Sequence, residues 1–536
     1  MQASAVYLAI VSRFVFAIFA VVALASCAAP QTPGTTHAST ARYDVFEKSL
    51  ATLAADLAAG RVTSMELVTL YSERIRALDQ SGPELHSVIT LNPRALDAAR
   101  ALDSERTAGH VRGPLHGIPI LIKDNIETAD PMPTTAGSLA LAHNFATNDA
   151  FVVAQLRAAG AIVLGKNNLS EWANIRSSRS TSGWSALGGL SKNPYALDRN
   201  PCGSSSGSGV AVAASLAAAA IGTETDGSIT CPASVLGLVG LKPTVGLVSR
   251  SRIIPISPLQ DTAGPMTRSV EDAQLLMRAL AGHDERDPTT SEARAHVQDL
   301  ASPLAPGALA GRRFGVLKFH TGFLGAVDAL FEAAVAELKN AGATVTVIDA
   351  FEGYSAIEER ELAILLRDFR KEVNAYLATT PPDVHTRSLR DVIAFNREHA
   401  DRELPHFGQD LFERAEATAS DDPAEVERVR GENRSAAAAG LDKLMAAGSL
   451  DALIAPTLSP AWMTDLVNGD HVLGGSTTLP AVAGYPHVTV PMGQVKGLPV
   501  GLSFIGPAWS DAKLLGFAFA YEQRTRLRRP PPLAPR

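Results

Sequence analysis

The chain has 536 residues, of which 46% are hydrophobic and 19% are charged, a composition that is ordinary for a globular protein with a large buried core. Its formal net charge is −7, from 55 acidic and 48 basic residues, so the chain as a whole has no positive field that would attract nucleic acid. We therefore expect no nucleic-acid partner.

Residues 1–26 are expected to be a secretion signal rather than part of the fold. Arg13 precedes an apolar run over residues 14–26, which is too short for a comfortable membrane span of roughly 20 residues and ends in small residues. The junction Leu24-Ala-Ser-Cys27 resembles the bacterial lipobox, in which the cysteine is lipidated and becomes the first residue of the mature chain. An uncleaved transmembrane anchor is the alternative.

Residues 27–41 are rich in Pro, Thr and Ser, and they are predicted to be a flexible tether between the anchor and the folded domain. The expected location is therefore the periplasm or cell envelope, with the chain lipid-anchored at Cys27. Membrane contact is expected only through this N-terminal anchor.

Residues 45–107 are predicted to be helical. Thr63-Ser-Met-Glu66 has the pattern of a capping box, in which the threonine caps the first turn and the glutamate reaches back to the cap. Apolar residues from Leu67 to Leu78 recur at helical spacing, and Gly60 suits the end of the preceding helix.

Short apolar runs then alternate with helical segments, a pattern that is typical of α/β folds. Residues 118–123 and 161–164 are predicted to be buried strands, separated by a helix that starts near Asp149. Further predictions are a helix of small residues over 210–220, mixed turn and strand over 236–241 and 243–248, and a helix opened by the capping box at 269–272.

The second half of the chain begins with a polar, Pro-containing stretch, residues 283–311, which is predicted to be a linker or a long surface loop. Residues 355–447 are charged and are predicted to be a mostly helical cover. Further predictions are strands at 314–317, 344–348, 452–455, 488–490 and 500–504, and a helix at 326–341.

The basic, Pro-rich tail over residues 524–536 is predicted to be solvated and disordered. Taken together, the alternation of helices and short buried strands predicts an α/β fold, with a large mixed sheet surrounded by helices in an α/β/α layering.

The run Cys202-Gly-Ser-Ser-Ser-Gly-Ser-Gly209 brings several hydroxyl groups together with flexible glycines. It fits the G-x-S-x-G elbow of α/β-hydrolases with Ser205 as the nucleophile, but that motif needs a preceding strand, and Pro194 and Pro201 argue against one. A phosphate loop has no support, because the G-x-x-x-x-G-K pattern followed by Ser or Thr does not occur. Residue content alone leaves open a tight turn and helix start without catalytic function.

Several motifs together resemble the amidase signature family, and within it the bacterial peptide amidases most closely. The matching segments are 113–119, Lys123-Asp-Asn125, 199–208, Gly222-Thr-Glu-Thr-Asp-Gly-Ser-Ile229, 240–248, 260–266, 455–457 and 483–487. They are spread over nearly all of the chain beyond the tether, so residues 42–523 are expected to form one amidase domain.

The resemblance implies a catalytic triad. Ser228 matches the family's nucleophile, Ser204 matches the bridging serine on a cis peptide bond, and Lys123 matches the base. Ser204 lies 24 residues before Ser228, which is the family's interval, whereas Ser205 and Ser206 are out of register.

Amide hydrolysis needs a base that deprotonates the attacking hydroxyl and then protonates the leaving nitrogen. A lysine can do both only when it is neutral, so its usual pKa of about 10.4 must fall. Desolvation under the apolar run at residues 118–122 is the expected cause for Lys123. Ser204 would then relay the proton between Lys123 and Ser228, a variant of the serine triad.

The resemblance also implies an oxyanion hole made of the backbone N–H groups of Thr225, Asp226, Gly227 and Ser228. Asp226 departs from the Gly-Gly-Ser of the broader family, and Thr230 departs from an arginine that is usual there; both choices resemble the peptide-amidase branch. Asp226 either orders the loop or contacts a substrate amide or cation.

The remaining candidate residues are interpreted as structural. Cys202 and Cys231 are expected to be buried thiols, although an oxidising compartment would permit a disulfide between them. Arg199 is expected to clamp the serine loop, and His116 and His487 to be hydrogen-bonding fixtures. No metal-ligand spacing occurs, and no cofactor is expected.

The resemblance therefore predicts an amidase that forms an acyl-enzyme on Ser228 and converts C-terminal peptide amides to the free acid and ammonia. A general aryl- or alkyl-amidase is the close alternative. A glutamine-hydrolysing component of a tRNA amidotransferase and a non-catalytic secreted binding protein are the more distant ones. The expected partner is a small-molecule or peptide amide, and the sequence does not indicate an oligomeric state.

Overall fold

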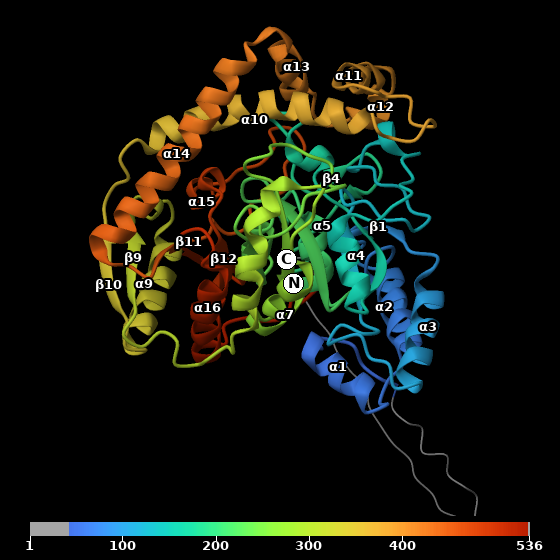
Figure 1. Cartoon of the computed structure of the whole chain (residues 1–536), viewed down its shortest axis with the longest axis horizontal. Helices are drawn as coiled ribbons and strands as arrows, with labels where there is room; N and C mark the ends of the chain where they lie inside the picture. Colours follow the sequence, from blue (N-terminus) through green and yellow to red (C-terminus); the bar gives the residue numbers. More distant parts are fainter. Residues whose placement is uncertain (1–41, 534–536) are drawn as a thin grey trace, which may run out of the picture. The chain divides into compact units, whose positions relative to one another are not determined.

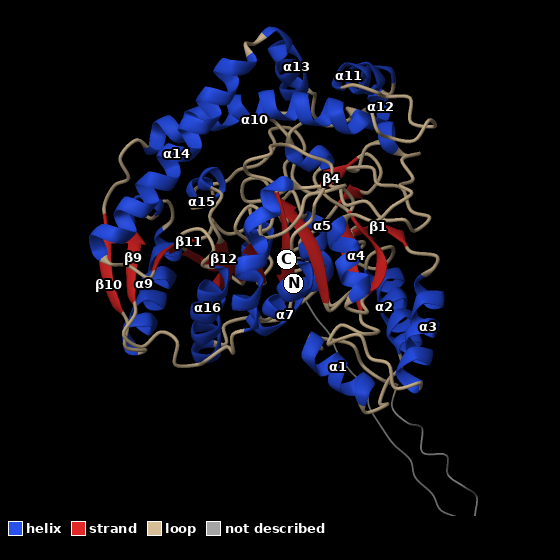
Figure 2. Ribbon diagram, viewed as in Figure 1, coloured by secondary structure: helices blue, strands red, loops and turns tan. Residues whose placement is uncertain are grey.

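The computed structural model describes residues 42–533, whose strands form one large and one small sheet (Figure 2). The large sheet contains β1 (Val88–Leu91), β2 (Pro119–Lys123), β3 (Ile162–Asn167), β6 (Ala219–Glu224), β7 (Val239–Lys242), β8 (Thr262–Thr267), β9 (Arg313–Leu317), β10 (Thr344–Ile348), β11 (Ala452–Pro456), β12 (His487–Val495) and β13 (Leu498–Ile505). The small sheet pairs β4 (Trp184–Ser185) with β5 (Gly189–Leu190).

The 11 strands of the large sheet follow the order β1-β3-β2-β6-β8-β7-β12-β13-β11-β9-β10. β2 is parallel to β3 and β6, and β9 is parallel to β10 and β11, whereas the strands between these two groups pair antiparallel. The predicted large mixed sheet is confirmed, as are the predicted strands in both halves of the chain. Residues from Asp44 onward form one compact unit.

Three neighbouring parallel strands end at the same edge of the sheet. β2, β3 and β6 end at Lys123, Asn167 and Glu224, and every residue of the three strands is buried. The edge where parallel strands present their carboxyl ends is the usual location of ligand sites in α/β folds. A candidate site is therefore expected at this edge of the sheet.

The N-terminal helices are α1 (Leu50–Ala58), α2 (Ser64–Leu78) and α3 (Ala95–Thr107). The predicted capping box is confirmed, because Thr63 Oγ1 accepts the Glu66 N–H at 3.1 Å and Glu66 accepts the Thr63 N–H at 2.7 Å. The prediction of an all-helical region is wrong at β1, which adds an antiparallel edge strand to β3. Four residues between two longer helices give too little periodicity to mark a strand.

The region around the serine run contains η1 (Leu139–Leu141), α4 (Phe151–Ala158), η2 (Glu171–Asn174), α5 (Ser206–Ala213), α6 (Thr230–Val235) and α7 (Val270–Leu280). The helix predicted over 210–220 is wrong in its second half, because α5 ends at Ala213 and Ala219 begins β6. β6 lies between β2 and β8 with every residue buried. In that position, sheet pairing overrides the helix propensity of its alanines.

The stretch predicted to be a linker or a long surface loop contains short helices. It folds into η3 (Pro288–Glu292), α8 (Ala293–His296) and η4 (Val297–Ala301). The His296 ring stacks on Trp509 with 4.3 Å between ring centroids, and Gln274 Nε2 donates to Ser302 O at 2.8 Å. These contacts hold the stretch on the surface of the same compact unit.

The region predicted to be a cover contains five α-helices. They are α10 (Tyr354–Leu377), α11 (Leu389–Glu398), α12 (Ala400–Glu403), α13 (Asp410–Ala417) and α14 (Pro423–Gly448), with η6 (Thr418–Ser420) between the last two. Figure 1 shows α10 crossing above the sheet. α10 packs against α11, α13 and α14.

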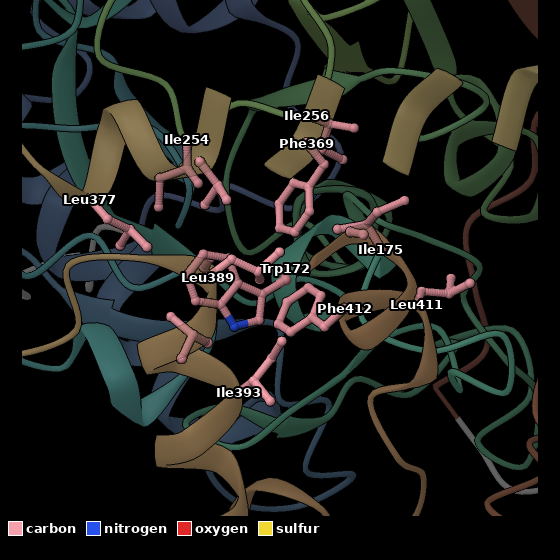
Figure 3. Packing of buried hydrophobic residues seen from close by; sticks show 14 of the residues in the cluster. Trp172, Ile175, Ile254, Ile256, Phe369, Leu377, Leu389, Ile393, Leu411 and Phe412 are labelled. Carbon is pink, nitrogen blue, oxygen red and sulfur yellow. The ribbon is translucent and has the colours of Figure 1, made fainter. Parts of the chain in front are cut away.

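An apolar cluster fastens this cover to the loop after β3 (Figure 3). Trp172 from that loop meets Phe412 of α13 edge to face, with ring centroids 5.8 Å apart, and Phe369 of α10 stacks on Phe412 at 5.3 Å. All three rings are buried. Burial of large aromatic side chains is worth several kcal/mol in all, so the cover is a fixed part of the domain.

The C-terminal part contains η5 (Lys318–His320), α9 (Gly325–Asn340), α15 (Thr478–Ala483) and α16 (Asp511–Thr525). The expectation of a solvated, disordered tail is wrong as far as residue 533. The Arg528 guanidinium pairs with the Glu47 carboxylate, and Leu533 N donates to Pro194 O at 3.1 Å. The half-buried Glu47 carboxylate is thus an ion-pair partner for the basic tail, and the sequence alone does not indicate this contact. No helix within residues 42–533 is long and apolar enough to cross a bilayer.

Candidate active site

The Lys123 side chain lies at the end of β2 and is fully buried. Its Nζ is 2.7 Å from Ser204 Oγ, 2.8 Å from Thr223 Oγ1 and 3.2 Å from Thr223 O. Asn125 Nδ2 donates to Thr223 Oγ1 at 2.9 Å and so fixes that hydroxyl. The structure therefore brings together Lys123 and Ser204, the two residues that the resemblance implied as base and bridging serine.

Burial lowers the pKa of Lys123 to about 7, although the negative charges of Glu224 and Asp261 act in the opposite direction. A neutral amine has two N–H donors and one lone pair. Thr223 offers two acceptors, its hydroxyl and its carbonyl, so the lone pair is left for the Ser204 hydroxyl. A neutral Lys123 can therefore point its lone pair at the Ser204 hydroxyl, whereas a protonated Lys123 would donate to the same three acceptors.

Ser204 follows a cis peptide bond from Gly203, as the resemblance implied. Its carbonyl accepts the Ser170 N–H at 3.0 Å, and its side chain is almost completely buried. Gly203 has no room for a side chain, since a Cβ would lie 2.0 Å from Ser170 Oγ. The serine loop is thus held against the loop after β3.

Ser228 lies just before α6, and its side chain is 9% exposed. Its carbonyl accepts the Ser205 N–H at 3.1 Å, which joins the two serine loops. The Glu224 carboxylate accepts the N–H groups of Ile229 at 2.7 Å and Thr230 at 2.9 Å. Glu224 therefore fixes the backbone on the far side of Ser228.

Gly227 has φ +74°, a left-handed conformation that favours glycine. A Cβ there would lie 3.2 Å from Thr477 Oγ1, so the backbone also passes close to the loop before α15. The turn before Ser228 thus needs a glycine at this position.

Cys202 and Cys231 form a disulfide with their Cα atoms 6.1 Å apart, so the expectation of two buried thiols is wrong. That distance lies within the range that disulfides span. The bond joins the residue two before Ser204 to the residue three after Ser228. It therefore ties the two serine loops together covalently.

The loop before Ser228 is fixed through its side chains. Thr225 Oγ1 donates to Asp261 Oδ1 at 2.6 Å, and Asp226 Oδ2 accepts from Thr478 Oγ1 at 2.9 Å. Burial raises the pKa of Asp226 above its ordinary value. Of the two roles considered for Asp226, these contacts favour ordering of the loop.

His116 and His487 make hydrogen bonds that fit the structural role expected for them. His116 Nε2 lies 2.9 Å from Leu102 O, and His487 Nε2 lies 2.6 Å from Ser503 Oγ. Burial lowers the pKa of His487 to about 3, so its ring is neutral at physiological pH.

The expectation that Arg199 clamps the serine loop is wrong. Its guanidinium pairs with Asp198 at 3.6 Å. The neighbouring Asn200 holds the loop instead, because its Oδ1 accepts the Cys202 N–H at 2.7 Å. The short amide side chain hydrogen-bonds the backbone two residues on, as Asn does in turns.

A family model for amidases matches residues 66–515. The chain belongs to the amidase family. A probable amidase of Arabidopsis thaliana is 40% identical to this amidase over 486 residues, which cover 88% of each chain. A glutamyl-tRNA(Gln) amidotransferase component of Halorhodospira halophila is 36% identical over 513 residues, which cover 90% of this chain and 98% of that one.

Solved structures agree with this assignment. The native peptide amidase of Stenotrophomonas maltophilia is 51% identical to this amidase, with a TM-score of 0.85 and coverage of 91% of this chain and 98% of that chain. An amidase family protein of Bacillus anthracis is 36% identical, with a TM-score of 0.81 and coverage of 91% and 92%. The predicted amidase-signature fold is confirmed, and the protein is a hydrolase that acts on amides.

A cavity of about 210 Å³ lies beside the Lys123 contacts of the amidase. Asn125, Thr223 and Thr225 form its polar wall, and Ile254 and Ile256 form an apolar one. No group of three or more His, Cys, Asp or Glu side chains within residues 42–533 could hold a metal ion.

Three residues of the amidase that matter to this geometry were not predicted from the sequence: Asn125, Thr223 and Glu224. They lie inside matched motifs, but residue content gives them no distinct role. Thr223 contacts Lys123 from a segment 100 residues away, and only the fold brings the two together. The one signal in the sequence was their position within the motifs 123–125 and 222–229.

Proposed function

We propose that this amidase converts C-terminal carboxamides of peptides to the free acid and ammonia through an acyl-enzyme on Ser228. The observation that carries the proposal is the contact of buried Lys123 Nζ with Ser204 Oγ at 2.7 Å, on a lysine whose pKa is lowered to about 7. A neutral amine next to a serine hydroxyl can start a proton relay without a histidine.

In the first half of the reaction, Ser204 gives its proton to Lys123 Nζ and takes the proton of Ser228 Oγ as that oxygen attacks the amide carbon. The carbonyl oxygen becomes an oxyanion, which the N–H groups of residues 225–228 stabilise. The relay then runs in reverse and protonates the leaving nitrogen, so ammonia departs and the acyl-enzyme remains. One such N–H donor is typically worth about 3 kcal/mol of barrier.

In the second half, water takes the place of the Ser228 hydroxyl. Lys123, through Ser204, removes a proton from the water as its oxygen attacks the acyl carbon, and returns that proton to Ser228 Oγ as the ester bond breaks. The products are the free carboxylic acid and the restored triad, and no cofactor is required.

The choice of peptide amides is supported by the 51% identity to the S. maltophilia peptide amidase. A peptide amidase has also been solved in complex with the competitive inhibitor chymostatin. Ammonia release should be measured on a panel of peptide amides, free amino-acid amides and aryl amides. We expect peptide amides to react with the highest kcat/KM, whereas faster aryl amides would identify a general amidase.

Mutation of the nucleophile tests the mechanism on the same panel. Ser228→Ala should lose about 10⁴-fold or more in kcat, since triad serines cost that much in other hydrolases. Ser206→Ala is the matched control, because Ser206 Oγ contacts Cys202 O at 2.6 Å and Ser170 Oγ at 3.4 Å and lies outside the proposed triad. Undiminished ammonia release by Ser228→Ala would overturn the mechanism.

We also propose that the protein is exported and lipid-anchored at Cys27, a residue that lies outside the described part of the chain, as do the signal and the tether. The Cys202–Cys231 disulfide supports export, because such bonds persist in oxidising compartments. Mass spectrometry of the mature N-terminus should find a lipidated Cys27. An intact Met1 would overturn the proposal.

A further inference from the structure

Two carboxyl groups face each other between the cover and the loop that leads to Ser228. Asp226 belongs to that loop, and Glu361 belongs to α10. The Glu361 side chain is 8% exposed, and the two side chains are within hydrogen-bonding reach of each other.

The other hydrogen bonds of this pair leave one oxygen without a donor. Glu361 Oε1 accepts from Gln260 Nε2 at 2.7 Å, and Asp226 Oδ2 accepts from Thr478 Oγ1 at 2.9 Å. Asp226 Oδ1 is buried and accepts no N–H or O–H of the described chain at hydrogen-bond geometry, although the Thr477 hydroxyl is near enough to Asp226 to favour its ionised form. A buried carboxylate oxygen without a donor is costly, so this atom calls for a proton donor.

Two carboxylates this close in a buried site cannot both be ionised, because each disfavours the charge of the other. Burial and the charge of Asp226 raise the pKa of Glu361 well above its ordinary value, and Glu358 on the same helix acts in the same direction. Burial also raises the pKa of Asp226, but Lys242 on β7 and the hydroxyls of Thr477 and Thr478 favour its ionised form.

The remaining titratable neighbours leave the proton on Glu361 and the negative charge on Asp226. Tyr354, one helical turn from Glu358, has its own pKa raised by burial and by the acidic groups near it, so it stays neutral. Lys242 is the cation that faces Asp226, whereas Glu358 faces Glu361. The proton therefore resides on Glu361, and the negative charge resides on Asp226.

We propose that Glu361 is a positioning residue of this amidase: its neutral carboxyl group donates a hydrogen bond to Asp226 Oδ1 and holds the backbone of residues 225–228 in place. Gln260 adds a second link, because its Nε2 contacts Glu361 Oε1 and also donates to Thr225 O at 3.3 Å. The cover thus fixes two consecutive residues of the oxyanion loop. The inference rests on the proposed function, in which those N–H groups stabilise the oxyanion.

Three variants test the role of the proton on Glu361. Glu361→Gln keeps a neutral donor toward Asp226 and an acceptor toward Gln260, whereas Glu361→Ala removes both. Glu359→Gln is the matched control, because it makes the same chemical change at an exposed position two residues away on α10. The kcat and KM of each variant should be measured for a peptide amide from pH 5 to 10.

We expect Glu361→Ala to lose about tenfold or more in kcat with less than a twofold change in KM, and Glu361→Gln to stay within threefold of the wild type. Any alkaline decline of kcat that comes from loss of the Glu361 proton should be absent from Glu361→Gln. Wild-type kcat in Glu361→Ala, or equal impairment of both variants, would overturn the proposal. Glu359→Gln should match the wild type throughout.

Infrared spectroscopy separates this inference from the proposed function, because it needs no turnover. At pH 7 the wild-type spectrum minus the Glu361→Gln spectrum should show the carbonyl band of a buried protonated carboxyl group, because other carboxyl groups whose pKa burial raises, such as Glu171 and Glu522, cancel in the difference. A difference spectrum without that band would overturn the inference alone. Inactivity of the wild type on every amide, with the band present, would overturn the proposed function alone.

Thermal unfolding of Glu361→Ala shows whether its loss of activity reflects misfolding. If Glu361→Ala is misfolded, the kcat of Glu361→Gln and the infrared band test the inference without it.

Discussion

Lys123 Nζ lies 2.7 Å from Ser204 Oγ at the end of a strand whose residues are all buried. Burial lowers the pKa of this lysine to about 7, close to the pH at which a general base is most useful. The strand therefore supplies both the position and the protonation state of the proposed base.

The rate of amide hydrolysis should depend on pH through Lys123. Below about pH 7 the lysine is protonated and cannot take a proton from Ser204, so kcat/KM should fall about tenfold for each further pH unit. The measurement is the rate of ammonia release between pH 5 and 8. A flat profile over that range would show that Lys123 is not the group whose ionisation limits the reaction.

The same pKa shift predicts a pH-dependent stability. The folded form holds Lys123 neutral above about pH 7, whereas the unfolded chain keeps its lysines protonated up to about pH 10.4. Unfolding takes up a proton within that window, so the free energy of unfolding should rise with pH, by up to about 1.4 kcal/mol per unit.

Lys123→Met isolates this contribution, because methionine does not titrate and other groups cancel in the difference. The free energy of unfolding of the variant minus that of the wild type should decrease steadily from pH 7 to pH 10 in urea titrations. The variant should be inactive throughout. A difference that does not change with pH would mean that the lysine is charged in the folded enzyme.

The hydroxyl of Thr223 should matter to catalysis through the orientation of Lys123. Thr223→Val removes the acceptor 2.8 Å from Lys123 Nζ and leaves the carbonyl contact at 3.2 Å. We expect about a tenfold loss of kcat, because the lost hydrogen bond, worth about 1–1.5 kcal/mol, helps to orient Lys123 Nζ toward Ser204 Oγ. The measurement is steady-state kinetics on a peptide amide.

Thr223→Ser is the control for this prediction, because it retains the hydroxyl that contacts Lys123 and Asn125. It should keep at least a third of the wild-type kcat. Equal losses in both variants would point to packing of the threonine methyl group rather than to the hydrogen bond.

The sequence predicted the parts of the site that depend on local pattern and motif spacing. The resemblance to the family, through its 24-residue interval, singled out Ser204 rather than Ser205 or Ser206. The apolar run before Lys123 predicted a buried strand, as the structure has it. Fold class and the main α/β alternation followed from periodicity, because buried strands and amphipathic helices leave regular patterns.

The parts that were missed depend on contacts between distant segments. The alanines of β6 read as helix because propensity ignores the neighbouring strands that enclose them. Glu224 and Glu361 gave no signal of their own, since in the sequence neither a carboxylate that accepts backbone N–H groups nor a carboxyl group that contacts another side chain differs from an exposed acidic residue. The disulfide could not be assigned either, because spacing along the chain does not give the distance between Cα atoms.

The disulfide between Cys202 and Cys231 should support both stability and activity. The two cysteines are 29 residues apart, and closing a loop of that length stabilises a fold by about 3–4 kcal/mol in the chain-entropy account. The bond also joins the loops of Ser204 and Ser228, so its loss should loosen the relay between them. We therefore expect the Cys202→Ala/Cys231→Ala double variant to unfold at lower urea concentration and to lose kcat more than it changes KM.

Reduction of the wild type provides the matched experiment. In a chain that begins after the signal and carries a lipidated Cys27, Cys202 and Cys231 are the two cysteines left to label. Thiol labelling should find no free thiol before treatment with a reductant and two free thiols after it. Activity and the urea midpoint should fall together on reduction and recover on reoxidation, while the double variant should not respond to the reductant. If the reduced wild type keeps its full kcat, the bond serves stability alone, and the two serine loops are held by hydrogen bonds such as that from Ser205 N to Ser228 O.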